Sequence, residues 1–147
     1  MLDDRIVLEQ NFSLDGHELD HDHRVMIDIV NKIVSLPRQF LSPLYDKYLS
    51  QFIDVSFRHF DEEIRLMRHN EYPEVGEHEM EHENFKRTVL ALLLEGEKEP
   101  NYQDMARYLR SWLASHIKWH DRHYVLFMEK KRATAHRPSA SEPESNR

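Results

Sequence analysis

The chain has 147 residues with only 3 Gly, no Cys and a net charge of −7. So few glycines argue against sandwiches, barrels and doubly wound folds, which need many tight turns, and the absence of thiols excludes disulfides, thiolate metal sites and cysteine nucleophiles. The negative charge does not favour nucleic acid or an anionic membrane as a partner.

The N-terminal segment, MLDDRIVLEQ, is expected to form an arm that precedes the helices. It has neither the basic start nor the apolar stretch of a secretory signal. No window of the chain approaches the ~18 consecutive apolar residues that a membrane span needs. We therefore expect a cytoplasmic protein.

Gly and Pro residues divide the rest of the chain into long stretches that contain neither. They stand at Gly16, Pro37, Pro43, Pro73, Gly76, Gly96 and Pro100, and near the C-terminal end at Pro138 and Pro143. Because Pro interrupts a helix and Gly often ends one, we predict four helices, over 20–36, 43–70, 74–95 and 101–131. Short connections make consecutive helices antiparallel, so the expected fold is an all-α, up-down-up-down four-helix bundle.

The expected domain covers residues 1–131. Residues 132–147, RATAHRPSASEPESNR, are polar, rich in Pro and Ser, and without periodicity. This composition is typical of segments that cannot bury a core, and we expect a disordered tail.

Each predicted helix has a stripe of apolar residues spaced three and four apart, as in a helix that buries one face. Each stripe also includes ionisable side chains, namely His23, His59, Glu63, His78, His82 and His116. A single His on such a stripe is usually a core residue with a hydrogen-bond partner. Several unpaired groups would each cost about 1–3 kcal/mol, which a bundle stable by about 5–15 kcal/mol does not tolerate. A metal ion would satisfy all of them, since imidazole and carboxylate ligate iron, zinc or copper.

Two spacings support a metal site. His59 and Glu63 are four residues apart, and so are His78 and His82. Residues at this spacing project from one face of a helix, so each pair is directed at a shared point.

The last helix leaves a choice open. His116 and Asp121 are five residues apart, which places them about 140° apart around a regular helix. Periodicity alone favours His120 as the partner of His116, and the residues by themselves do not decide between His120 and Asp121.

Two other metal templates fit less well. Ferritin-like di-iron proteins use Glu-x-x-His on two helices; Glu79 and His82 match it, as do Glu18 and His21, but Glu18 precedes the first predicted helix. The zinc motif H-E-x-x-H does not occur in the chain.

In their order along the chain, these motifs resemble the hemerythrin family, most closely its single-domain bacterial members. The matching segments are LDHDH ending at His23, HFDEEIRLM with His59 and Glu63, YPEVGEHEMEHENF with His78 and His82, and WLASHIKWHD with His116 and Asp121. The resemblance covers roughly residues 8–128.

The resemblance implies two iron ions bridged by an oxo or hydroxo group. Seven side chains would hold them: His78, His82 and His116 on one iron, His23 and His59 on the other, and Glu63 and Asp121 bridging the two. This set leaves one coordination position open, on the iron with two histidines, and in the family that position takes O2.

By the same resemblance, Phe60, Trp112, Leu113 and Ile117 correspond to the O2 pocket. All four are apolar, and a dry pocket favours reversible binding over turnover. Ordinary core packing is an equally good interpretation of the four residues. The expected function is reversible O2 binding for storage, delivery or sensing, and an enzyme is not favoured.

Some positions depart from the family pattern. Leu8 stands where the family commonly has Trp, and His21 and Asp22 stand where Glu and Gln are more usual. The remaining histidines have no role in the pattern, and most are expected at the surface; for His120 and His123, an effect on the electrostatics of the pocket or adventitious metal binding is the alternative.

Two other functions stay open: a di-iron oxidoreductase that reduces peroxide, NO or O2, and a signalling module that responds to iron or O2. The only partner expected is O2 or a similar small ligand. Neither nucleic acid nor membrane is expected, and a monomer is the default.

Overall fold

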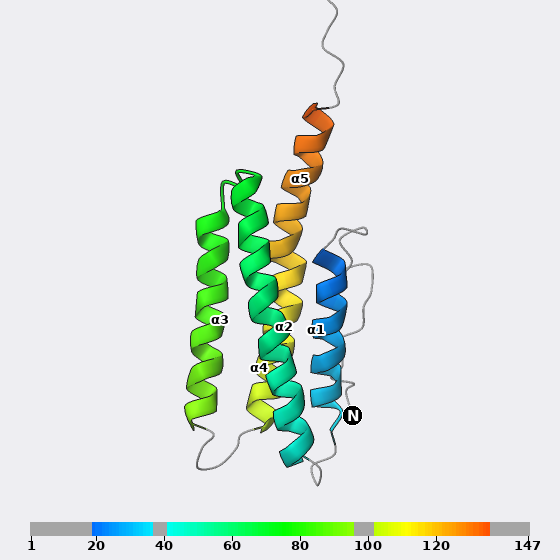
Figure 1. Ribbon diagram of the computed structural model, residues 1–147, viewed down its shortest axis with the longest axis vertical. Coiled ribbons are helices and arrows are strands. Elements are labelled where there is room, and N and C mark those ends of the chain that lie inside the picture. Colours follow the sequence, from blue (N-terminus) through cyan, green and yellow to red (C-terminus); the bar gives the residue numbers. More distant parts are fainter. Residues whose placement is uncertain (1–18, 37–40, 96–101, 136–147) are drawn as a thin grey trace, which may run out of the picture.

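The computed structural model describes residues 19–36, 41–95 and 102–135. Its elements are α1 (Leu19–Val34), α2 (Leu41–His69), α3 (Val75–Glu95), α4 (Tyr102–Ser115), the single π-helical segment η2 (His116–Asp121) and α5 (Arg122–Ala135). The last three run on as one rod, so the described residues form four rods (Figure 1). The predicted all-α four-helix bundle is confirmed.

Each rod packs against the two that flank it. Helix α1 contacts α2 and α4, α2 contacts α3, and α3 contacts α4. This pattern closes the bundle around a central space that all four rods face. None of the helices in the described ranges combines the length and apolar character that a membrane crossing requires.

The helix ends lie within a few residues of the predicted ones. Helix α2 begins two residues before Pro43, which is tolerated because the first turn of a helix has no internal partner for its N–H groups. The last rod continues to Ala135, four residues beyond the expected end, so the first residues of the segment 132–147 are helical. The rest of that segment, and the N-terminal arm with Leu8, lie outside the described residues.

Two apolar clusters make up the core. The larger cluster includes Met26, Phe52, Phe85 and Leu109. The smaller one is formed by Leu19, Ile64, Met67, Tyr72, Tyr124 and Val125. Along each rod, the predicted metal ligands fall where one cluster gives way to the other. The polar residues therefore form a layer between two apolar regions.

A Schellman motif ends α2. The N–H of Tyr72 donates to the carbonyl of Met67 at 2.9 Å, and the N–H of Glu71 donates to the carbonyl of Arg68 at 3.1 Å. This motif places one residue in the left-handed region, and that residue is Glu71, with φ 57°. The turn brings buried Tyr72 back against the smaller apolar cluster.

Replacing Glu71 by glycine is expected to stabilise the protein by about 1 kcal/mol, because a residue with a Cβ pays about 1–2 kcal/mol in the left-handed region and glycine does not. Thermal or urea unfolding measures the change. Glu71→Ala serves as the control, since it removes the same charge but keeps the Cβ. Equal stability of the two variants would contradict this account of the turn.

Candidate metal centre

The inward faces of α1, α2 and α3 carry five of the predicted ligands. His59 and Glu63 lie one turn apart on α2, and His78 and His82 lie one turn apart on α3, while α1 contributes His23; all five are buried. Of the nine buried polar or charged residues among the described ones, seven are the predicted ligands. The polar interior of this bundle is thus almost wholly the predicted site.

The fourth rod contributes His116 and Asp121 through a π-helical turn. The N–H of Arg122 donates to the carbonyl of Ile117, five residues earlier, as in a π-helix. In such a turn, residues five apart lie nearly above one another, so both side chains face the interior. The expectation that they would lie about 140° apart was wrong, because it assumed a regular α-helix.

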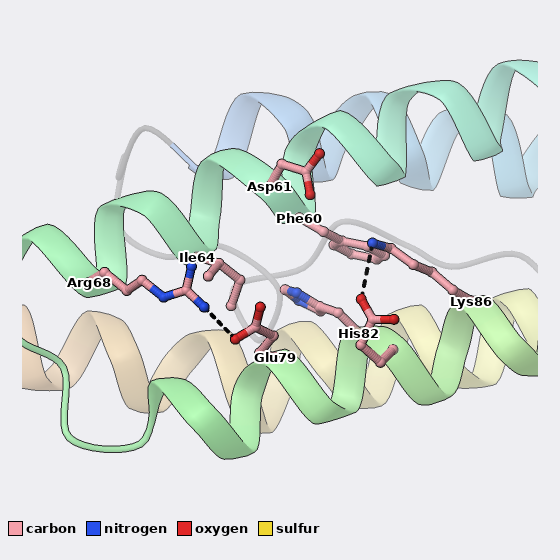
Figure 2. Close-up of a pocket in the computed structure, with 8 residues that line it drawn as sticks. Phe60, Asp61, Ile64, Arg68, Glu79, His82 and Lys86 are labelled. Atoms are coloured by element: carbon pink, nitrogen blue, oxygen red, sulfur yellow. Dashed lines mark hydrogen bonds and ion pairs between the residues drawn. The ribbon is translucent and has the colours of Figure 1, made fainter.

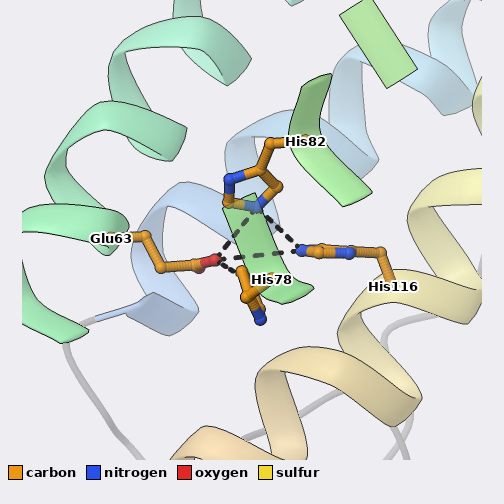
Figure 3. Close-up of side chains that lie close together, drawn as sticks. All are labelled: Glu63, His78, His82 and His116. Carbon is orange, nitrogen blue, oxygen red and sulfur yellow. Dashed lines mark hydrogen bonds and ion pairs between the residues drawn. The ribbon is translucent and has the colours of Figure 1, made fainter. Parts of the chain in front are cut away.

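Glu63 stands at the centre of the cluster. Its Oε1 lies 3.1 Å from His82 Nε2 and 3.8 Å from His116 Nε2, and it contacts His78 Nε2 as well (Figure 3). Its Oε2 lies on the other side, 3.0 Å from His59 Nε2. One carboxylate therefore faces three histidines with one oxygen and a fourth histidine with the other.

Asp121 divides its oxygens in the same way. Its Oδ1 lies 3.1 Å from His116 Nε2 and 3.2 Å from His78 Nε2. Its Oδ2 lies 2.9 Å from His23 Nε2. The two carboxylates therefore span the same two groups of imidazoles.

The donor atoms form two groups that share Glu63: one with His78, His82 and His116, the other with His23, His59 and Asp121. Within each group the ligand atoms lie within 4.8 Å of one another. The resemblance implies the same division of the five histidines. Asp121 falls in the second group because its ligand atom lies closer to those of that group.

Several of these atoms have no hydrogen bond. Within the described part of the chain, both ring nitrogens of His23 and both oxygens of Asp121 are buried and unsatisfied, although His23 Nε2 and Asp121 Oδ2 are only 2.9 Å apart. A cation in the cluster would accept a lone pair from His23 Nε2 and from the Asp121 oxygens, and N/O donors of this kind suit iron or zinc. The residues present therefore fit a metal centre.

Burial and charge act in opposite directions on both carboxylates. Burial raises the pKa of Glu63, but the four imidazoles around it hold that pKa well below its usual value. Burial and the charge of Glu63 raise the pKa of Asp121, yet the imidazoles of His116 and His23 likewise hold it well below. Both side chains are therefore anionic, as metal binding requires.

Two histidines take up the compensating charge when no metal is bound. Burial lowers the pKa of His59, but Asp22 and Glu63 raise it overall to about 10. Burial lowers the pKa of His78, and Asp121 and Glu63 raise it overall to about 9. Both rings are therefore protonated near neutral pH in the metal-free protein.

The predicted pocket residues lie against the histidines. The ring of Phe60 stacks on His82, with centroids 4.0 Å apart, and the ring of Trp112 stacks on His116 at 4.4 Å. Leu113 and Ile117 are buried in the larger apolar cluster. Phe60 and Trp112 also contact each other, with centroids 5.5 Å apart. An apolar wall thus covers the side of the cluster that carries three histidines.

A polar cavity of about 270 Å³ lies between α2 and α3 and reaches Phe60 and His82 (Figure 2). Arg68 donates to Glu79 across it at 2.6 Å, and Lys86 donates to Glu83 at 3.3 Å. Of the four predicted pocket residues, Phe60 alone lines this cavity. The charged side chains that line the cavity therefore lie close to His82 of the three-histidine group.

The alternatives that the sequence left open differ in burial and position. His120 is partly exposed, with its Nε2 3.5 Å from Glu81, and lies outside both donor groups, whereas Asp121 is fully buried. Glu79 pairs with Arg68 instead of joining the cluster. Glu18, required by the ferritin-like template, lies outside the described residues, and His21 is exposed.

One close contact was missed by the sequence motifs. Asp22 Oδ2 accepts a hydrogen bond from His59 Nδ1 at 2.8 Å, on the side of the ring away from Glu63. Its place directly before His23 in LDHDH was the only available signal. Helical periodicity does not indicate which neighbouring helix such a side chain reaches.

The comparisons agree with the geometry. The family model for the hemerythrin HHE cation binding domain matches residues 15–125. The chain is similar to the bacteriohemerythrin of Clostridium acetobutylicum, with 27% identity over 81% of this chain and 98% of the relative. It is also similar to the bacteriohemerythrin of Methylococcus capsulatus, with 31% identity over 71% and 82%, and to the myohemerythrin of Theromyzon tessulatum, with 23% identity over 79% and 88%.

Metal binding to the metal-free protein is expected to release about two protons per chain near pH 7.5, because the ligands must be neutral or anionic to coordinate while His59 and His78 start out protonated. Calorimetric titration with Zn²⁺ in buffers of different ionisation enthalpy measures the release. The release should decrease as the pH rises through about 9 and 10, the pKa values at which the two rings lose their protons in the metal-free protein. A binding heat that is independent of the buffer at pH 7.5 would contradict this charge balance.

Proposed function

The chain belongs to the hemerythrin family of non-haem iron proteins that bind O2, and on this premise we propose that it binds O2 reversibly at an open position of a di-iron centre. One iron is held by His78, His82 and His116 and the other by His23 and His59. Glu63 and Asp121 bridge them, together with an oxo or hydroxo group.

The observation that carries this proposal is the division of the two carboxylates. Oε1 of Glu63 faces the three-histidine group and Oε2 faces His59. Oδ1 of Asp121 faces the same three-histidine group, and Oδ2 faces His23. Two parallel bridges of this kind suit two metal ions and would be redundant for one.

The donor set is unequal, and this inequality supports binding of a small ligand. One group has three imidazoles and the other has only His23 and His59, so the open position belongs to the second iron. When bound, the reduced iron pair supplies the two electrons that O2 binding requires.

Apolar side chains of the chain limit the access of water to part of the centre. The buried side chains of Phe60, Leu113 and Ile117 are apolar and exclude water from the neighbouring part of the core. Exclusion of water and of large reductants favours release of the ligand unchanged. This apolar packing beside the three-histidine group supports a binding protein.

A second candidate, an oxidoreductase that reduces peroxide, NO or O2 at the same centre, is favoured by the polar cavity between α2 and α3. Reduction needs protons, and Glu79, Glu83 and Lys86 bring exchangeable groups close to His82. Sustained turnover with a chemical reductant under steady-state conditions would support this alternative over O2 binding.

We expect the iron-loaded protein, reduced without air and then aerated, to develop a visible absorption band that bleaches when O2 is removed. Irreversible loss of the reduced state on first exposure to air would rule out the reversible binding function. Repeated cycles with recorded spectra measure it directly.

The protein is also expected to hold two irons per chain, and both Glu63→Ala and His78→Ala should lower that number, because each removes a donor from the shared cluster. Metal analysis measures the content, and circular dichroism checks that the helices persist. His120→Ala is the matched control, since it removes a neighbouring imidazole outside both groups. One zinc per chain, or equal loss in the control, would contradict the site.

A further inference from the structure

Asp22 contacts the predicted ligand His59 but lies outside both donor groups. Its Oδ2 lies 2.8 Å from His59 Nδ1, and the opposite nitrogen, Nε2, lies 3.0 Å from Glu63 Oε2. The ring of His59 therefore lies between two carboxylates: Glu63, within the cluster, and Asp22, outside it. Once Nε2 coordinates a metal, the remaining ring proton resides on Nδ1 and is donated to Asp22.

This contact distinguishes His59 from other histidines of the cluster. Nδ1 of His23, of His82 and of His116 is buried and has no hydrogen-bond partner in the described ranges. A carboxylate partner fixes the orientation of a ligating imidazole and increases its basicity. Asp22 therefore strengthens electron donation on the two-histidine side, where the open position is proposed.

The side chain of Asp22 is 42% exposed, whereas that of His59 is 2% exposed. An aspartate with this access to water is ionised at neutral pH and does not bear the cost of a fully buried charge. The negative charge of Asp22 at the edge of the bundle is therefore in hydrogen-bond contact with a buried predicted ligand, His59.

We propose that Asp22 is a positioning residue that, through His59, increases electron donation to the two-histidine iron and thereby favours its oxidised state. The proposal rests on the proposed function for its reference to iron. The contact between Asp22 and His59 itself can be tested with zinc. Charge and orientation are separable, because asparagine keeps an oxygen acceptor and loses the charge, while alanine loses both.

The first experiment compares the wild type with Asp22→Asn and Asp22→Ala, with Asp28→Asn as a matched control that removes an exposed aspartate from the same helix. Iron content should stay at two per chain in Asp22→Asn and Asp28→Asn. The midpoint potential of the iron pair should rise, and oxidation by air should slow, in both Asp22 variants and not in Asp28→Asn. An unchanged potential in Asp22→Asn would overturn the proposal.

The second experiment uses the zinc-loaded protein and depends on neither iron nor O2. The Nδ1 proton of His59, followed by nuclear magnetic resonance, should exchange slowly with water in the wild type and in Asp22→Asn, and quickly in Asp22→Ala. Zinc affinity should fall about 10-fold or more in Asp22→Ala, the range found when such partners are removed. Unchanged exchange and affinity in that variant would show that the contact does not position His59.

The two experiments separate the possible failures. If the wild type does not take up two irons, the proposed function fails, and the zinc experiment still decides whether Asp22 positions His59. If O2 binds reversibly and the potential is the same in all variants, the proposed function stands and the role assigned to Asp22 is wrong.

Discussion

Mutual compensation of buried charge is the interaction on which this structure depends. Glu63 and Asp121 are fully buried carboxylates, and burying an isolated carboxylate is prohibitively costly. Histidines from every rod of the bundle surround them. The packing of each rod is therefore tied to an electrostatic requirement at the centre as well as to the burial of its apolar stripe.

The arrangement of the core follows from this requirement. A polar layer inside a bundle interrupts apolar packing, and here it separates a large cluster that includes Phe52 and Leu109 from a smaller one that includes Met67 and Tyr124. Apolar packing on both sides holds the histidines at a fixed separation before any metal arrives. Such preorganisation lets a metal bind without large movement of the backbone, at the cost of unsatisfied atoms such as those of His23 in the metal-free state.

Sequence reasoning reached most of the fold and the cluster because both depend on regular periodicity. The positions of Pro and Gly marked the helices to within a few residues, and apolar stripes identified the inward faces. The exceptions are local departures from the regular helix. The left-handed Glu71 ends a helix without glycine, and the contact of Asp22 with His59 depends on how two helices are placed relative to each other.

Asp121 shows the same limit most clearly. Its selection over His120 came from resemblance alone, because α-helical geometry favours a spacing of four residues. The π turn supplies the physical reason: it rotates the chain so that the fifth residue faces inward. The irregular segment contains both predicted ligands of this rod, and π turns frequently occur at functional sites.

The π turn also changes what an insertion or deletion would do in this rod. A π turn contains one residue more than a regular helix of the same course, and removing a residue between His116 and Asp121 would leave them at the i,i+4 spacing of an α-helix. The same deletion elsewhere in α4 or α5 would rotate all downstream side chains by about 100°. The interval 117–120 is therefore a place where this rod can lose one residue while the inward-facing residues on either side keep their direction.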